Sequence, residues 1–250
     1  MSEKTALVTN VRDYVGPPAV DALVAAGFKV TAHDPSFEDS SLRQAYAEAH
    51  PGVTPVDVQT PDALIRRMTE NGCAIDVLVS NDTYPAIHGP IESADIDDLR
   101  KTIDAVVMFP FALMQAAIPV FKKQGRGNII LITSCRTELP MPGGAIPDIA
   151  RAGANALVKS LSLDLAPHNV PVNAVAPNYL YSEAYFPKAK FIDDPRGKAF
   201  IRDVVPAGRL GQPEEIGETI RYLAEMKGAF HTGTIIKFAG GWPAAPVRPV

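Results

Sequence analysis

Short apolar runs that alternate with helical patterns constrain the fold of this chain most strongly. Each run is apolar almost throughout, so both faces of each strand should be buried, as in a parallel sheet. Strand followed by helix, repeated along the chain, predicts βαβ units and a doubly wound α/β fold. The strand-like runs lie at 5–9, 28–32, 75–80, 128–133, 170–176 and 234–238, and the helical patterns at 16–26, 60–71, 92–123 (two helices), 148–166 and 213–226.

The whole chain, 1–250, is predicted to form one domain, because parallel-sheet domains often reach this length. Pro147-Asp148 and Pro213 mark two helix starts, since proline and acidic residues suit a first helical turn. The Pro-rich segment 243–250 is read as an irregular C-terminal tail. A frayed terminus and packing on a neighbouring subunit both remain open for it.

Charge and composition argue against several partners. The net charge is −4 and the basic residues are scattered, so neither nucleic acid nor an anionic membrane is expected to bind. The chain opens on a strand pattern without a leader-like segment, and no apolar run approaches the roughly 18 residues of a membrane span, so a cytoplasmic location is expected. Cys73 and Cys135 lie far apart and are read as small core residues, with no disulfide and no metal site.

The first loop, 9–16, reads Thr-Asn-Val-Arg-Asp-Tyr-Val-Gly. A dinucleotide-binding loop needs glycines here for a tight turn and for close approach to pyrophosphate, and only the last residue is one. Asp13 adds negative charge and Tyr14 adds bulk, while Arg12 restores no space. Asp34 ends the second strand, where an acid could hold a ribose, but it is read as a solvated loop carboxylate. We therefore expect no NAD(P) cofactor.

In open α/β sheets, ligands bind beyond the carboxyl ends of the strands. Ser134 ends a strand there, and Arg151 lies on the helix that follows. With Asn173 and the late segment TGTIIKFAGGW, this arrangement resembles the Ser…Tyr-x-x-x-Lys pattern of short-chain dehydrogenases, and the resemblance implies a Rossmann-like sheet of seven strands. Arg151 stands at the lysine position, and Val106 stands near the position of a further dehydrogenase asparagine.

The chain resembles more closely the halohydrin dehalogenases, the cofactor-free branch of that superfamily. Their pattern is Thr-x4-Phe/Tyr-x-Gly, matched by Thr9, Tyr14 and Gly16, followed by Ser-x12-Tyr-x3-Arg, matched in part by Ser134 and Arg151. The segment 177–212 then corresponds to the loop and helix of the substrate and halide pocket. The resemblance implies these pocket residues: Thr9, Tyr14, Asn81, Pro177, Asn178, Tyr179, Leu180, Tyr185 and Phe186.

The resemblance also implies a mechanism without a cofactor. In that family the serine holds the substrate oxygen, a tyrosine removes its proton, and the arginine lowers the pKa of that tyrosine. The resulting alkoxide closes an epoxide and expels halide, and halide, azide, cyanide or nitrite can open the ring again. The expected partners are therefore a small haloalcohol or epoxide and these anions. Permanent charge suits arginine to this task.

One residue departs from the pattern: Pro147 stands where the family has its tyrosine, and no tyrosine lies between Ser134 and Arg151. Proline has no ionisable group, and loss of a general base commonly costs about 10²–10⁴-fold in rate. Asp148 is the nearest substitute, and Arg151 on the same helix face could keep it ionised. A plain helix-start aspartate is the alternative. A tyrosine from a neighbouring loop, at 84, 179 or 185, is a further alternative.

Three functions follow in order of preference: a halohydrin dehalogenase with altered proton transfer, a ligand-binding or assembly protein without turnover, and a nicotinamide oxidoreductase. Simple structural alternatives also remain, in which Ser134 bonds backbone, Arg151 is an exposed helical arginine, and the aromatic residues at 179–186 form a core or interface cluster. Superfamily resemblance further implies a homotetramer through the helices at 92–123 and 148–166, with the segment near Trp242 reaching a neighbour.

Overall fold

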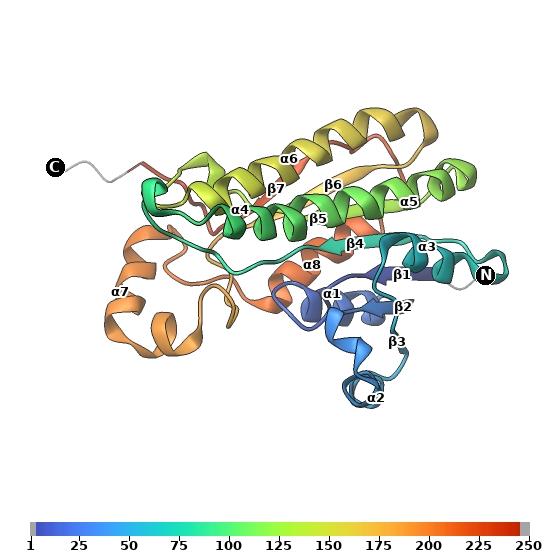
Figure 1. The fold of residues 1–250 in the computed structure, drawn as a ribbon, viewed down its shortest axis with the longest axis horizontal. Coiled ribbons are helices and arrows are strands. Elements are labelled where there is room, and N and C mark those ends of the chain that lie inside the picture. Colours follow the sequence, from blue (N-terminus) through green and yellow to red (C-terminus); the bar gives the residue numbers. More distant parts are fainter. Residues whose placement is uncertain (1–3, 246–250) are drawn as a thin grey trace.

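A computed structural model describes residues 4–245 of the chain, and its centre is one parallel sheet of seven strands (Figure 1). The strands lie in the order β3-β2-β1-β4-β5-β6-β7, so the order reverses between β1 and β4. The Rossmann-like fold predicted from the sequence is therefore confirmed. The strands are β1 Lys4–Val8, β2 Phe28–His33, β3 Val53–Val56, β4 Val77–Asn81, β5 Asn128–Ile132, β6 Val172–Pro177 and β7 Ile235–Phe238.

Helices cover both faces of the sheet, which explains why the strands are apolar throughout. Helices α1 and α8 pack on one face, against side chains such as Val8, Val79 and Ile130. Helices α3, α5 and α6 pack on the other, against Leu7 and Leu78. The helices are α1 Gly16–Ala25, α2 Ser40–Ala49, α3 Pro61–Thr69, α4 Ile96–Ile103, α5 Phe109–Gln124, α6 Ala145–Leu165, α7 Pro195–Val204 and α8 Pro213–Ala224.

Two predicted helix starts agree with the structure. Helix α8 begins at Pro213, with a capping box between Gln212 and Glu215. Helix α6 begins at Ala145, three residues before the predicted start, and Pro147 lies in its first turn, where a backbone N–H has no partner within the helix. Pro147 therefore belongs to a regular helix start.

The predicted pair of helices at 92–123 is one nearly continuous rod, in which the π-helical turn Asp104–Met108 joins α4 to α5. Ile96–Gln124 is 29 residues long and apolar enough to cross a membrane by length and composition, so the expectation that no segment reaches that limit was wrong. Core helices of water-soluble proteins pass the same test, and this rod packs beside α3 and α6. Of the 18-residue stretch of this rod that meets the hydropathy limit, 28% is buried inside the structure.

The segment 177–212 contains the π-helical turn Ala189–Asp193 and helix α7, which form a lobe beyond the carboxyl ends of β5 and β6 (Figure 1). Of the predicted tail 243–250, residues 246–250 lie outside the described residues. Trp242, predicted to approach a neighbouring subunit, packs against Tyr179 of its own chain. Cys135 is buried as predicted, but Cys73 is exposed, because it follows a short turn at the surface after α3.

Candidate active site

The first loop is closed by hydrogen bonds from its own chain. The buried Asn81, at the end of β4, donates its Nδ2 protons to the carbonyls of Asn10 and Asp13, both at 2.9 Å. Asn10 returns a bond from its own Nδ2 to the Asn81 carbonyl at 2.7 Å, and the Asn81 N–H donates to Thr9 Oγ1 at 2.9 Å. Asn10 and Tyr14 adopt positive φ angles of 49° and 54°, a conformation that these bonds help to hold.

The loop 9–15 has none of the glycines that a dinucleotide-binding loop uses to approach pyrophosphate. At Gly16 a Cβ atom would meet the Asn10 carbonyl oxygen, so only glycine fits where the loop packs on the start of α1. Asp34 is buried, which corrects its reading as a solvated carboxylate: it accepts bonds from the backbone N–H groups of Arg12 and Ser36 at 3.1 and 3.0 Å. The position that could hold a ribose instead braces the loop.

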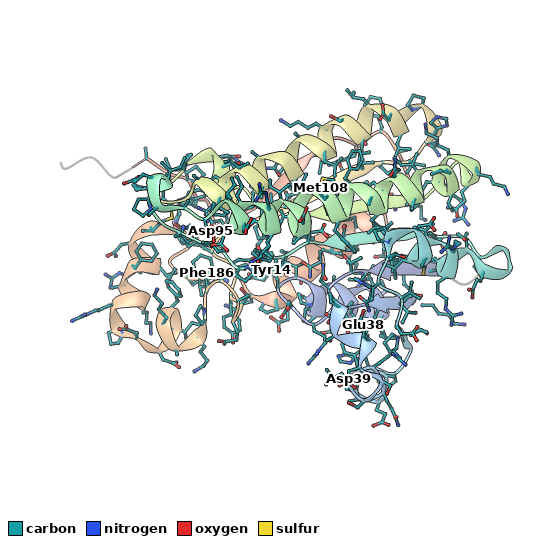
Figure 2. The ribbon with its side chains drawn as sticks, viewed as in Figure 1. Tyr14, Glu38, Asp39, Asp95, Met108 and Phe186 are labelled. Carbon is teal, nitrogen blue, oxygen red and sulfur yellow. The ribbon has the colours of Figure 1, made fainter. Side chains whose placement is uncertain are left out.

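A cavity of about 790 Å³ opens beyond the carboxyl ends of β5 and β6. Most of the predicted site residues line it: Tyr14, Ser134, Pro147, Arg151, Pro177, Asn178, Tyr179, Tyr185 and Phe186. Figure 2 labels Tyr14 on the first loop and Phe186 in the segment that leads to α7, and both line this cavity.

Within residues 4–245, four predicted site residues do not line this cavity, and each has another position. Thr9 and Asn81 are fully buried and hold the first loop. Leu180 packs in the core beside α8. Asp148 points to Arg136 and not to the cavity. Their prediction as pocket or base residues is corrected accordingly.

Ser134 follows β5 and is 6% exposed, with its hydroxyl at the cavity wall. Its Oγ donates to the Pro177 carbonyl at 3.1 Å and accepts from the Arg136 N–H at 3.2 Å. Asn155 Nδ2 donates to the Ser134 carbonyl at 2.9 Å and fixes the backbone. The serine therefore bonds backbone, as its simple structural reading expects, and it also lines the cavity.

Arg151 is buried, which excludes its reading as an exposed helical arginine. Its Nη1 donates to the carbonyls of Asp82 and Ile132, at 3.0 and 3.4 Å. Its Nη2 donates to the hydroxyl of Tyr185 at 3.3 Å. A planar fork of donors can reach these three acceptors at once, and a lysine ammonium could not reproduce that geometry. Arg151 thus places a fixed positive charge at the cavity wall.

Asp148 and Arg151 do not pair, contrary to the prediction. Asp148 Oδ1 accepts from Arg136 Nε at 2.5 Å, and both side chains are mostly buried. Position 148 is one helical step, about 100°, from position 147, so the carboxylate leaves the helix on another side. An ion-paired carboxylate outside the cavity is poorly placed to act as a base.

Asp82 is a buried group that the sequence reading missed. Its Oδ2 accepts from Ser80 Oγ at 2.7 Å, and Oδ1 contacts no hydrogen-bond donor among the described residues. Burial raises the pKa of Asp82 to about 7, although Ser80 and the Arg151 charge lower it. A carboxylate directly after a buried strand was the available signal, and its burial beside Arg151 depends on tertiary packing.

The aromatic residues of the 177–187 loop form both a wall and a cluster. Tyr179 packs on Phe186 and Trp242, with ring centroids 5.3 and 5.7 Å apart. Tyr185 packs edge-on against Tyr14 at 4.8 Å. The pocket and core-cluster readings of these residues are therefore compatible.

Comparisons with known proteins agree with this fold. The family model described as Enoyl-(Acyl carrier protein) reductase matches residues 15–243. The chain belongs to the short-chain dehydrogenase/reductase superfamily. Among its relatives are Dehydrogenase/reductase SDR family member 4 of Homo sapiens, 25% identical over 98% of this chain and 89% of the relative, and a 3-oxoacyl-[acyl-carrier-protein] reductase of Synechocystis, 28% identical over 96% and 97%.

Among solved structures, the chain is also similar to proteins described as dehalogenases. A halohydrin dehalogenase (HheC) bound to ethyl (2S)-oxiran-2-ylacetate is 36% identical, with a TM-score of 0.94 over 99% of this chain and 100% of that chain. A protein described as a dehalogenation enzyme is 34% identical, with a TM-score of 0.91 over 96% and 98%. The chain is thus similar to oxidoreductases and, at higher identity, to dehalogenases of the same fold.

Proposed function

We propose that this protein is a halohydrin dehalogenase-like lyase that converts vicinal haloalcohols to epoxides without a cofactor. The observation that carries the proposal is a first loop without phosphate-binding glycines and closed by hydrogen bonds from Asn81, next to a cavity lined by Ser134 and the buried Arg151. The 36% identity to a halohydrin dehalogenase over nearly the whole chain supports it.

In this proposal Ser134 holds the substrate oxygen. Its hydroxyl already makes one donor and one acceptor bond to backbone, and rotation would turn the proton into the cavity. The substrate O–H loses its proton, the oxygen attacks the neighbouring carbon, and the carbon–halogen bond breaks with its electron pair on the halide. Ring opening by azide, cyanide or nitrite reverses this path.

The leaving halide needs a site with apolar walls and polar donors. We propose that it lies against Asn178, Tyr179 and Phe186 of the pocket loop, all of which line the cavity. The rings of Tyr179 and Phe186 exclude water from the anion, which strengthens its attraction to the positive charge of Arg151 in the same cavity.

Halide release from 1,3-dichloro-2-propanol and azide-driven opening of an epoxide test the proposal. The expected result is turnover above the rate of the buffer alone, with one proton released for each halide. A folded protein without turnover would contradict it. Binding of bromide or epoxide without turnover would then favour the second candidate, a ligand binder that lost its chemistry when Pro147 replaced the tyrosine.

A nicotinamide oxidoreductase is the third candidate, favoured by the names of the curated relatives. Against it, the first loop lacks the glycines that a dinucleotide-binding loop uses, and Arg151 stands where the resembled dehydrogenases have the lysine that holds the ribose. Calorimetry with NADH and NADPH tests it directly. Tight binding of either would reverse this order of candidates.

We further propose a homotetramer, built on the rod Ile96–Gln124 and helix α6. Met108 and Phe111 on the rod are 54% and 51% exposed, and Ile149 on α6 is 50% exposed, so apolar surface remains to be covered. Figure 2 shows Met108 on this helical layer. Light scattering should give the mass of four chains, and a monomer mass would contradict the proposal. The cytoplasmic location stays a prediction.

A further inference from the structure

Proline at position 147 means that helix α6 presents no phenol to the cavity, although the resembled family takes its acid–base group from this position. Another group must then exchange the proton with the substrate oxygen. Apart from the two arginines and Lys190, the titratable side chains that line the cavity are Tyr14, Tyr84, His88, Tyr179 and Tyr185. The useful one must have its acidic atom beside a fixed positive charge, because proton removal leaves a negative charge there.

Tyr185 meets this condition. Its hydroxyl oxygen lies 3.3 Å from Arg151 Nη2, which points a donor at it. The backbone N–H of Tyr84 points a second donor at the same oxygen, at 3.4 Å. The phenol donates its own proton to the Tyr84 carbonyl at 2.8 Å. The oxygen therefore meets two donors and one acceptor, which gives it a hydrogen-bond partner both with its proton and without it.

The ring of Tyr185 is also held in place. Tyr14 packs edge-on against it with ring centroids 4.8 Å apart, and the Tyr185 N–H donates to Ser182 Oγ at 3.2 Å. Arg151 is itself fixed by two backbone carbonyls, of Asp82 and Ile132. A general base works when its atom is positioned before the reaction begins, and this phenol is positioned by both its backbone and its ring.

The other candidates are less suitable. Burial raises the pKa of Tyr14 far above its usual value, so this phenol stays protonated. Burial also raises the pKa of Tyr179, whose ring packs among aromatic neighbours. The pKa of His88 is lowered by partial burial and by the charge of Arg136. Among the described contacts, Arg151 donates no hydrogen bond to the side chain of His88 or of Tyr84.

We propose that Tyr185 is the catalytic acid–base residue of this protein, so that the phenol comes from the loop after β6 instead of from helix α6. The inference rests on the proposed function. The Tyr185 phenolate takes the proton of the substrate hydroxyl, the freed oxygen forms its bond to the neighbouring carbon, and the carbon–halogen bond breaks with both electrons on the halide. In ring opening, the Tyr185 phenol returns the proton to the epoxide oxygen while the anion attacks carbon.

Tyr185→Phe removes one oxygen atom and keeps the ring that packs on Tyr14. We expect kcat for halide release to fall by about 10²–10⁴-fold, as for loss of a general base, with a smaller change in KM. Tyr181→Phe is the matched control. Its hydroxyl bonds Glu183 at 2.8 Å in the same loop, outside the cavity, so its removal should leave kcat unchanged.

Restoring the missing phenol provides a second arm. Pro147→Tyr should recover activity in the Tyr185→Phe protein, because a phenol on α6 would again face Ser134 and Arg151. If Tyr185→Phe keeps the wild-type kcat, the assignment of Tyr185 is wrong while the proposed function stands. If His88→Gln causes the loss instead, the base is the imidazole. If the wild type releases no halide, the proposed function itself fails.

A crystal soaked with ethyl (2S)-oxiran-2-ylacetate tests the geometry independently of turnover. The epoxide oxygen should lie within hydrogen-bond reach, about 2.6–3.2 Å, of both Ser134 Oγ and the Tyr185 hydroxyl. An oxygen bound to Ser134 but out of reach of Tyr185 would overturn the inference. An epoxide seated outside this cavity would count against the proposed function as well.

Discussion

Replacing Asn81 by alanine tests whether one buried amide holds the first loop closed. The change removes the two Nδ2 bonds to the carbonyls of Asn10 and Asp13. Each such bond contributes about 0.5–1.5 kcal/mol, and the carbonyls left behind lose a buried partner. With the cavity that the amide leaves, we expect the free energy of unfolding to fall by about 2–3 kcal/mol, or about 4–12 °C in Tm for a chain of this size.

Asn128→Ala is the matched control, because Asn128 Nδ2 also donates to two backbone carbonyls, of Ala224 and Met226, at the other end of the sheet. Both variants are compared by urea denaturation at one protein concentration. Only Asn81→Ala should also speed cleavage after the exposed Arg12 by an arginine-specific protease. We call the hydrogen bonds between Asn81 and the loop residues Asn10 and Asp13 the clasp. Equal cleavage in the two variants, or an unchanged Tm in Asn81→Ala, would show that the clasp does not hold the loop closed.

Three further perturbations test the site. Arg151→Lys should lower kcat for halide release by at least about tenfold, since an ammonium cannot reach all three acceptors, and an unchanged rate would remove Arg151 from the site. Gly16→Ala should lower the free energy of unfolding, measured by urea denaturation, by about 3 kcal/mol, because the new Cβ would meet the Asn10 carbonyl. An unchanged free energy of unfolding would mean that the loop moves to make room for the methyl group. Burial raises the pKa of Asp82 from 3.8 to about 7, so the folded protein holds this proton more tightly than the unfolded chain does. As pH rises from about 4 to 7, the free energy of unfolding of the wild type should therefore fall by about 4 kcal/mol relative to that of Asp82→Asn. Curves of stability against pH that run parallel for the two proteins would contradict this.

The sequence predicted the strands that have long apolar runs and missed strand β3, which has no such run. Strand β3, Val53–Val56, is four residues long, contains Pro55 and buries only its two ends. Helix α2 has no buried residue, and α7 buries only Ile201. Apolar periodicity exists only where a face is buried, so these three elements gave no pattern to read.

Residue spacing could place Ser134 and Arg151 at one site, because both positions are fixed by a strand end and a helix turn. It could not place their partners. The Asp148–Arg136 pair joins a helix to the preceding loop, and the contact of Tyr185 with Arg151 spans 34 positions. Such contacts depend on how loops pack, and they decide which carboxylate or phenol faces the cavity.

The clasp between Asn10 and Asn81 bears on how this chain could change over generations. Binding a dinucleotide would need new glycines in the loop, a different residue at the end of β4 and release of Asp34 from the backbone that it now braces. Replacing Asn81 or Asp34 alone would leave backbone groups without a partner before any binding repaid the loss. Selection for redox chemistry in this scaffold should therefore begin from a stabilised parent.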